Sequence, residues 1–462
     1  MLMLPTTISR LLQAYPFTLL QGNPQQPVTG ISIDTRTLQP GDVFVAFTGT
    51  RVDGHERIEE AFSKQAAAVI ISRPEAQYAL QNFAHFPVLL AQDTLQAVQA
   101  IARQERDSFD GPVFGITGSN GKTTSKEMLL ASLSTVTQPL GTKGNFNNEL
   151  GMPLTILQRS PKDGAMVLEM GMRGRGQIAE LCQIARPTCG LITNIGHSHI
   201  ELLGSQEAIA DAKTELFAAL PADGFAIVNM DDPFLKKRIH RTKAQIVDVS
   251  LHDQTCSVYA NDIQLGDEET SFTFVMNGHR HSVRLLASGL HNVQNALLVL
   301  AAASACGYEI EGLIQGMATY RPTQGRLYPR KGAYGRTILD DSYNASPLSA
   351  RASLDVLKIT GDVKKKWAIL GDMYELGNYT EEGHRTVGEY AAHLGIPVIC
   401  IGQFAKIMAD AIAQAGGKCE YFPSIEEALP HLPSLLPVDS VVLVKASRGM
   451  QFEKIVEHLV NG

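Results

Sequence analysis

Short apolar runs recur through the middle of the chain, and segments with helical periodicity separate them. Each run is five or six residues long, which is the length of a buried strand. The runs cover residues 112–117, 165–170, 190–194 and 225–229. Alternation of strands and helices is typical of a parallel sheet with helices on its faces, so we predict an α/β domain here.

Two further elements are predicted in the same part of the chain. Polar and apolar residues alternate at 271–275, which predicts an antiparallel hairpin within residues 255–287. An alanine-rich pattern predicts a helix over 291–305, ended by Gly307. Apolar periodicity also predicts a helix over 205–220.

Similar but shorter alternations flank this region on both sides. Before it, strands are predicted near 31–33, 42–47 and 68–71, helices over 58–64 and 94–104, and a polar linker over 106–111. After it, strands are predicted at 337–339, 366–370, 398–401 and 440–444. We therefore predict three domains: a small N-terminal α/β domain over 1–108, a central parallel-sheet domain over 109–319, and a C-terminal Rossmann-like α/β domain over 320–462.

Composition narrows the class of protein. A length of 462 residues fits two or three domains, and a net charge of −7 argues against a nucleic-acid binder with a broad basic face. Two short basic runs, 236–238 and 364–366, are predicted to be solvated surface. No apolar stretch approaches the roughly 20 residues of a membrane span. Six cysteines without a C-x-x-C pair indicate reduced thiols in a cytoplasmic protein.

The strongest chemical signal follows the strand predicted at 112–117. The loop reads Gly118-Ser119-Asn120-Gly121-Lys122-Thr123-Thr124, and a helical pattern comes next. Glycines let backbone N–H groups close around phosphate oxygens, and the helix N-terminus adds its positive dipole end. Lys122 would neutralise the β- and γ-phosphates, and the Thr123 hydroxyl would hold Mg²⁺. The strict phosphate-loop pattern fails at Ile116, where its first glycine should stand, but the context still predicts a nucleoside triphosphate site.

Polar side chains follow other predicted strands, at the edge of the sheet where ligands of open α/β sheets bind. Glu169 ends the run at 165–170 and is a hard oxygen ligand that suits Mg²⁺. His197 and His199 follow the run at 190–194. Each histidine could serve as a metal ligand or as a structural hydrogen-bonding group, and the sequence leaves both interpretations open.

Lys213 stands in the apolar stripe of the helix predicted over 205–220. Its amine could reach water while its stem stays buried, or it could be a functional amine whose pKa is lowered by burial. Asn292 and Asn295 share one face of the helix predicted over 291–305. They could bind a base edge, or they could cap the helix start.

Together these residues resemble the Mur ligase family of peptidoglycan synthesis, over the whole chain. The family marks are residues 117–123 with His199, Lys213, Asn292, Arg326 and Asp341. Narrower marks lie at 33–36, 53–55, 145–149, 370–377 and 445–448, and they resemble the members that add D-alanyl-D-alanine. The Asp-Asn-Pro-Arg motif of the diaminopimelate-adding members is absent from the chain. The family's phosphate loop is the shorter variant seen here.

The resemblance implies an ATP-dependent ligase that forms a carbon–nitrogen bond. Such an enzyme would join D-alanyl-D-alanine to UDP-N-acetylmuramoyl-tripeptide through an acyl phosphate and release ADP and phosphate. The product would be the UDP-muramoyl-pentapeptide of peptidoglycan synthesis, which serves cell-wall biogenesis, cell shape and cell division. The third residue of the tripeptide, diaminopimelate or lysine, stays open. We expect a cytoplasmic monomer.

The resemblance also implies a role for individual residues. ATP contacts are expected from residues 118–124, from Asn292 and Asn295 at the adenine, and from Arg326 and Asp341 beyond the second domain boundary. Two Mg²⁺ ions are expected on Thr123, Glu169, His199 and Lys213, with Lys213 carbamylated by CO₂. The candidates for catalysis are Lys122, Glu169, His199 and Lys213.

Substrate contacts are implied for all three domains. Ser32, Thr35 and Arg36 are the candidates for the uridine nucleotide, and Asn147 and Asn148 for the muramoyl-peptide. Ser447 and Arg448 are the candidates for the incoming dipeptide, although Ala446 stands where many relatives have glycine.

Three other interpretations remain. The chain could be another Mur-type ligase that adds a different amino acid, with folylpolyglutamate synthase as a more distant relative by its phosphate loop. It could be a P-loop kinase or an NTPase switch that hydrolyses ATP without an acceptor amine. It could also be a non-catalytic nucleotide-binding module, which the coexistence of Glu169, His199 and Lys213 argues against.

Overall fold

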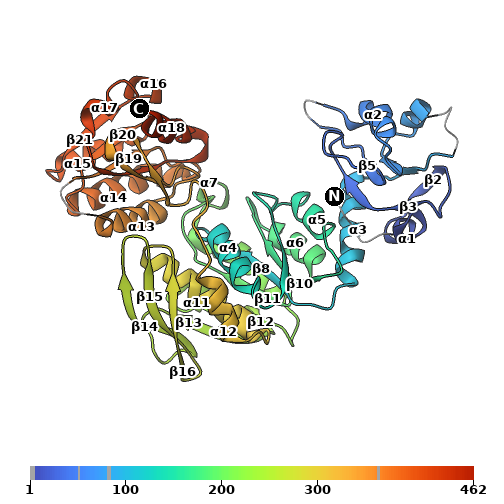
Figure 1. The fold of residues 1–462 in the computed structure, drawn as a ribbon, viewed down its shortest axis with the longest axis horizontal. Coiled ribbons are helices and arrows are strands. Elements are labelled where there is room, and N and C mark those ends of the chain that lie inside the picture. Colours follow the sequence, from blue (N-terminus) through green and yellow to red (C-terminus); the bar gives the residue numbers. More distant parts are fainter. Residues whose placement is uncertain (1–5, 50–51, 81–84, 362–364) are drawn as a thin grey trace.

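The computed structural model describes residues 6–49, 52–80, 85–361 and 365–462. Three α/β domains follow one another along the chain, each built on its own sheet (Figure 1). The N-terminal domain (blue) and the C-terminal domain (orange to red) lie on opposite sides of the central domain (Figure 1). The predicted three-domain α/β fold is confirmed.

The central domain contains a nine-stranded sheet with the order β16-β15-β14-β13-β12-β11-β8-β10-β9. Strands β8 to β14 run parallel to their neighbours, and β15 and β16 continue the sheet antiparallel. The strands are β8 (Val113–Thr117), β9 (Gln138–Gly141), β10 (Asp163–Glu169), β11 (Cys189–Ile192), β12 (Phe225–Asn229), β13 (Gln245–Ser250), β14 (Val258–Leu265), β15 (Thr270–Met276) and β16 (His279–Leu285). The predicted hairpin is therefore the three-stranded meander β14–β16.

Strands β9 and β13 were not predicted from the apolar pattern, for a physical reason. The edge strand β9 contains proline and glycine and has no buried residue, and β13 begins with two exposed positions. Neither strand forms the continuous apolar run of a strand that is buried on both faces.

Helices cover both faces of this sheet. One face packs against α4 (Lys122–Leu133), α11 (Leu290–Ala305) and α12 (Ile310–Met317), and their buried side chains form one core cluster with β8, β10 and β11. The other face packs against α5 (Gly151–Ile156), α6 (Gln177–Ala185), α8 (Gln206–Lys213) and α9 (Glu215–Ala219). The helix predicted over 291–305 is confirmed as α11.

The helix predicted over 205–220 is wrong in one detail, because it is divided at Thr214 into α8 and α9. The Thr214 hydroxyl donates a hydrogen bond of 2.7 Å to the carbonyl of Ala210, four residues earlier. Such bonds bend helices, since the side chain competes with the backbone for the carbonyl. Lys213 is consequently the last residue of α8.

The predicted linker over 106–111 is also wrong at its start. Helix α3 (Thr94–Asp107) continues through Arg106, whose guanidinium is buried. Its Nε donates to the carbonyl of Ala185 at 2.7 Å, and its Nη2 donates to the carbonyl of Arg186 at 2.8 Å. The polar character of this stretch therefore reflects a buried arginine that binds the central domain, and α3 packs against α5 and α6 there.

The two outer domains have smaller sheets. The N-terminal sheet has the order β2-β7-β6-β5-β4, and the C-terminal sheet has the order β17-β18-β22-β19-β20-β21. The N-terminal strands are β2 (Thr18–Gln21), β4 (Gly30–Ser32), β5 (Asp42–Val45), β6 (Ala68–Ile71) and β7 (Val88–Leu90). The C-terminal strands are β17 (Tyr328–Lys331), β18 (Thr337–Asp340), β19 (Lys366–Gly371), β20 (Val398–Ile401), β21 (Cys419–Phe422) and β22 (Val441–Lys445). Each sheet is parallel except for one edge strand, β2 or β17.

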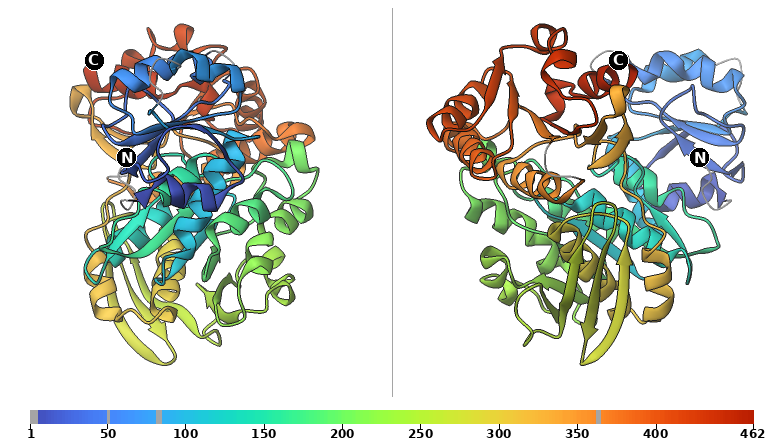
Figure 2. Two further views of the ribbon diagram at one scale, coloured as in Figure 1. Left: turned by 90° about the vertical axis from the view of Figure 1, so that its right-hand side faces the viewer. Right: turned by 60° about the vertical axis from the view of Figure 1, so that its left-hand side comes forward.

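Figure 2 shows the same arrangement from two other sides, with the C-terminal domain above the central domain in both views. In the described part of the chain, no helix has the length and apolar character needed to cross a membrane.

The basic run at 364–366 only partly matches its prediction as solvated surface. Lys364 lies outside the described residues, and Lys365 is exposed. Lys366 is buried, and its ammonium donates to the carbonyl of Lys358. Neighbouring residues at the start of β19 alternate between exposed and buried positions. Charge alone therefore cannot show which of the two lysines is buried.

Candidate active site

A large cavity of about 1020 Å³ lies where the central and C-terminal domains meet. Residues of both domains line it, which brings together segments that are far apart in the sequence. The predicted site residues that line it are Ser119, Asn120, Gly121, Lys122, Thr123, Thr124, Asn147, Asn148, Glu169, His199, Asn292, Asn295, Arg326 and Asp341.

The phosphate loop is fixed in place by the end of the neighbouring strand β11. The Thr193 hydroxyl donates to the carbonyl of Asn120 at 2.5 Å, and the Asn120 N–H donates to Asn194 Oδ1 at 3.1 Å. The Ser119 N–H donates to the carbonyl of Asn194 at 2.9 Å. The sequence analysis missed Thr193 and Asn194 as loop anchors, because only the sheet order shows that β11 lies beside β8.

Gly118 is a position where only glycine fits. Its φ is +151°, and a Cβ atom there would lie 1.9 Å from Thr193 Oγ1. Because Thr193 is already bound to the loop, it cannot move away without releasing the Asn120 carbonyl. The close approach of the backbone to Thr193 therefore requires glycine.

We expect Gly118→Ala to lower the free energy of unfolding by about 2–4 kcal/mol and to weaken ADP binding, because the loop must shift to relieve the overlap. Urea denaturation and calorimetric titration with ADP measure the two effects. Gly174→Ala is the matched control, since a Cβ at Gly174 meets nothing within 4 Å. Equal stability and equal ADP affinity of the two variants would contradict this account of the loop.

Lys122 begins α4, and its Nζ donates to the carbonyl of Gly118 at 2.7 Å. The ammonium thus lies over the loop that is predicted to hold phosphates. Burial lowers the pKa of Lys122, and the Glu169 carboxylate opposes this shift. Gly121, with φ +81°, caps the helix beneath Asn295, whose Oδ1 would lie 2.8 Å from an added Cβ.

Glu169 ends β10 and has one carboxylate oxygen without a partner. Its Oε1 accepts a hydrogen bond of 2.9 Å from Asn147 Nδ2, and its Oε2 is buried and meets no hydrogen-bond partner among the described residues. A buried, unpartnered carboxylate oxygen beside Thr123 in the same cavity fits a hard cation. In the part of the chain that the structure describes, no three His, Cys, Asp or Glu side chains group as metal ligands. Hydroxyl, phosphate or water oxygens would therefore have to complete the shell.

Lys213 does not line this cavity and is only 1 % exposed. The interpretation in which its amine reaches water is therefore wrong. Burial, together with the charge of Lys122, lowers the pKa of Lys213 well below its ordinary value. The side chain thus favours the uncharged amine, which is the nucleophilic form.

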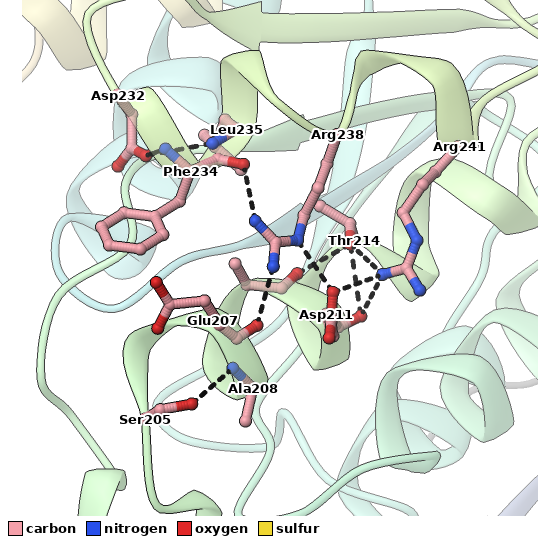
Figure 3. Close-up of polar contacts among 11 residues, drawn as sticks. Ser205, Glu207, Ala208, Asp211, Thr214, Asp232, Phe234, Leu235, Arg238 and Arg241 are labelled. Carbon is pink, nitrogen blue, oxygen red and sulfur yellow. Dashed lines mark hydrogen bonds and ion pairs between the residues drawn. The ribbon is translucent and has the colours of Figure 1, made fainter.

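The helix that carries Lys213 is held by two arginines (Figure 3). Arg238 Nε donates to Asp211 Oδ1 at 2.8 Å, and Arg241 Nη1 donates to the Asp211 carbonyl at 2.9 Å and to Thr214 Oγ1 at 2.7 Å. These bonds satisfy the carboxyl end of α8 on both sides of Lys213. The basic run at 236–238, predicted to be solvated surface, is therefore partly wrong, since Arg238 is a structural donor whose side chain is 13 % exposed.

The two candidate histidines differ in their surroundings. His199 lines the cavity, and its Nδ1 lies 2.6 Å from Glu375 Oε2 of the C-terminal domain. His197 stacks on Tyr379, with ring centroids 4.0 Å apart and ring planes 8° from parallel. His197 does not line the cavity, and its Nδ1 meets no hydrogen-bond partner among the described residues, so the structure supports stacking on Tyr379 and neither of the two predicted roles.

On the opposite wall, α11 contributes Asn292 and Asn295. Asn292 Nδ2 donates to the carbonyl of Ser288 at 2.8 Å, and the N-cap position of α11 is Gly289, with no side chain capping the helix, so the capping interpretation is wrong. His291 also lines the cavity and was missed by the sequence analysis. Burial lowers the pKa of His291 to about 4, which leaves its imidazole neutral near pH 7.

The C-terminal domain contributes a buried charge pair. Asp341 Oδ2 accepts from Lys445 Nζ at 2.6 Å and from the Ser353 hydroxyl at 2.6 Å. The Arg326 guanidinium lies 4.2 Å from the centre of the Tyr343 ring. Lys445 lines the cavity, but the sequence analysis gave it no role beyond its place in the segment 445–448. The sequence gives no sign that Lys445 pairs with Asp341.

The remaining predicted residues do not line the cavity. Gly118, the first residue of the loop, is absent from the lining. Ser32, Thr35 and Arg36 lie in the N-terminal domain, where exposed Arg36 pairs with Asp34. Ser447 Oγ accepts from the Tyr374 N–H at 2.8 Å, and the Arg448 guanidinium lies 5.7 Å from the centre of the Tyr343 ring.

Comparison with known proteins identifies relatives over the whole length. Sequence models of three Mur ligase parts match: the Mur ligase family catalytic domain at 27–106, the Mur ligase middle domain at 116–303, and the glutamate ligase domain at 325–448. The chain is 34% identical to the UDP-N-acetylmuramoyl-tripeptide--D-alanyl-D-alanine ligase of Bacillus subtilis over 99% of both chains. It is 35% identical to the Synechocystis ligase of the same name over 94% of this chain and 92% of the relative.

Solved structures agree with these relatives. A crystal structure of MurF from Acinetobacter baumannii superposes with a TM-score of 0.90 at 30% identity and 100% coverage of both chains. The MurF ligase of Thermotoga maritima in complex with ADP has a TM-score of 0.80 at 28% identity, covering 94% of this chain and 97% of the other. With this agreement of sequence and fold, the chain belongs to the Mur ligase family.

Proposed function

We propose that this chain is the ATP-dependent ligase that adds D-alanyl-D-alanine to UDP-N-acetylmuramoyl-tripeptide. The product would be the UDP-muramoyl-pentapeptide of peptidoglycan synthesis, made in the cytoplasm by a monomer. The observation that carries the proposal is the shared cavity, in which a phosphate loop and Glu169 face Arg326 and Asp341 of another domain. The names of relatives at 29–35% identity over nearly their whole length support the choice of substrates.

The reaction has two steps. The terminal carboxylate of the tripeptide attacks the γ-phosphorus of ATP, so that an acyl phosphate forms and ADP leaves. The amine of D-alanyl-D-alanine then attacks the acyl carbon, loses a proton and expels phosphate. Both reactants of the first step are negative, so cations must lie between them. Lys122 on the loop and Arg326 on the facing domain would supply such cations, and both line the cavity.

The residues present fit Mg²⁺, and Thr123 and Glu169 would hold the first ion, as the unpartnered Glu169 Oε2 supports. His199 and a carbamylated Lys213 would serve a second ion. Bound Mg²⁺ would neutralise charge on the phosphates. A cationic lysine would repel Mg²⁺. Burial lowers the pKa of Lys213, which favours loss of its proton, and an uncharged amine can react with CO₂ to give a carboxylate-like group.

Substrate contacts follow the division into domains. Asn292 and Asn295 would contact the adenine, and Asp341 the ribose. Asn147 and Asn148, which line the cavity, would hold the muramoyl-peptide. Ser32, Thr35 and Arg36 would bind the uridine nucleotide, and Ser447 and Arg448 the dipeptide.

The test is phosphate release from ATP and Mg²⁺, with and without each acceptor. Release that requires both UDP-N-acetylmuramoyl-tripeptide and D-alanyl-D-alanine, with the pentapeptide product seen by mass, is the expected result. Steady release with ATP alone would instead favour an NTPase switch. Silence with both acceptors would favour another Mur-type amino-acid ligase.

A further inference from the structure

Two loops from different domains meet beside the cavity, and the function proposed above does not use all of their contacts. One loop leads into α7 (Ile200–Leu203) of the central domain, and the other leads into η6 (Gly377–Tyr379) of the C-terminal domain. The second loop belongs to the segment 370–377 that the sequence analysis singled out. Its carboxylate, Glu375, contacts His199 with 2.6 Å between Oε2 and Nδ1.

The backbone holds both partners in an unusual conformation. His199 has φ +67° and Glu375 has φ +62°, although neither residue is glycine. Left-handed conformations are costly for such residues and persist only where the surroundings impose them. Two of them facing one another across a domain boundary indicate that the backbone is arranged to aim these side chains.

Further contacts fix the two loops together. The Glu201 N–H donates to the carbonyl of Glu375 at 3.3 Å, and a Cβ at Gly377 would lie 3.0 Å from Glu201 Cα. His197, two residues before His199, stacks on Tyr379 of the other loop's η6. The approach is thus backbone to backbone, and it brings Glu375 Oε2 to ion-pair distance from His199 Nδ1, a nitrogen that has no aligned hydrogen bond among the described residues.

An ordinary surface ion pair does not account for this arrangement. The side chains of His199 and Glu375 are 23% and 46% exposed, and pairs so exposed contribute little to stability. Such a pair would not offset two left-handed residues. Histidines that bind metals, in contrast, commonly donate the N–H of their other ring nitrogen to a carboxylate. This hydrogen bond fixes the tautomer and the orientation of the ring.

We propose that Glu375 is a positioning residue of the metal site, which holds His199 by Nδ1 from the C-terminal domain and leaves Nε2 for the metal. The inference rests on the proposed function, since it assigns the second metal to His199. Because the carboxylate comes from another domain, metal binding and docking of the two loops are coupled. Docking of the loops must therefore increase the metal affinity by the same factor by which metal binding increases docking.

The test uses Mn²⁺ as the probe, bound to the full-length protein with a non-hydrolysable ATP analogue. Electron paramagnetic resonance gives the Mn²⁺ affinity, and spin-echo modulation detects an imidazole nitrogen bonded to the ion. We expect Glu375→Ala to weaken the histidine-bound Mn²⁺ on the order of 10-fold and to diminish the nitrogen modulation. Glu375→Gln should retain most of both, because its amide oxygen keeps the same reach as the carboxylate and can lie at the same distance from Nδ1.

Glu381→Ala is the matched control, because it removes an exposed carboxylate of the same domain that pairs with Arg385. It should leave both signals unchanged. Two results would overturn the proposal: unchanged affinity and modulation in Glu375→Ala, or no imidazole nitrogen on Mn²⁺ in the unsubstituted protein. Neither readout needs turnover, so a failure of the ligation assay would count against the proposed function alone.

Discussion

Lys122→Ala is expected to reduce ligation by about 10³-fold or more. The ammonium lies over the phosphate loop, with Nζ 2.7 Å from the Gly118 carbonyl, and it is the cation supplied by the loop itself. Its removal leaves the charge that develops on the transferred phosphoryl group without a partner, and one such donor is worth about 10²–10³ in rate. Loss of a full charge is expected to exceed that range.

Phosphate release in the presence of both acceptors measures this effect, and calorimetric titration with ADP separates binding from chemistry. Lys162→Ala is the control, since Lys162 is exposed at a distance from the loop. Its activity should match that of the unsubstituted protein. Near-normal turnover of the Lys122 variant would refute the assignment of residues 118–124 as the phosphate loop.

Lys213→Ala is expected to be almost inactive, with a loss on the order of 10²–10³-fold, and to be partly rescued by formate or acetate. The buried site left by the side chain can admit a small carboxylic acid, whose carboxylate would stand where the carbamate stood. Phosphate release with increasing formate measures the rescue. Full activity without rescue would show that no carbamate is needed.

Lys213 should lower the free energy of unfolding, although activity is expected to require it. Burial holds the pKa of Lys213 well below its ordinary value of 10.5, so between that lowered pKa and about 10.5 the unfolded chain binds more protons than the folded chain. The free energy of unfolding therefore rises with pH until about 10.5 is reached. Lys213→Met lacks this dependence and should be the more stable protein near pH 7, by a margin that shrinks as the pH rises. Urea denaturation at several pH values in CO₂-free buffer measures it.

The parts of the site that could be predicted are those whose evidence is contiguous in the sequence. Residues 118–124 combine strand, loop and helix signals. Lys213 could be recognised because a lysine is unusual in the apolar stripe of a helix. Thr193 and Asn194 could not be recognised, because their role depends on β11 lying next to β8. Glu375 could not be recognised either, since its partner lies in another domain.

One group of errors in the fold arose because polar residues were taken as exposed. Arg106 and Lys366 are buried, and the charged group of each donates a hydrogen bond to a backbone carbonyl. Arg238 donates in the same way to the carbonyls of Phe234 and of Glu207 in α8. Long cationic side chains satisfy carbonyls at helix ends from a distance, and no local pattern reveals this. The strands that were missed are partly exposed or contain proline or glycine, so they lack the apolar run by which a strand is recognised.

The unequal attachment of the two outer domains matters for inhibitor design. The N-terminal domain continues into the central domain through α3, which Arg106 binds into place, whereas an irregular segment over 318–327 leads to the C-terminal domain. A compound that spans the N-terminal and central domains would therefore find its two anchor points at a nearly fixed spacing. A compound that reaches into the C-terminal domain would instead have its second anchor point on a domain joined by this irregular segment, and any share of molecules in another orientation would lower its apparent affinity.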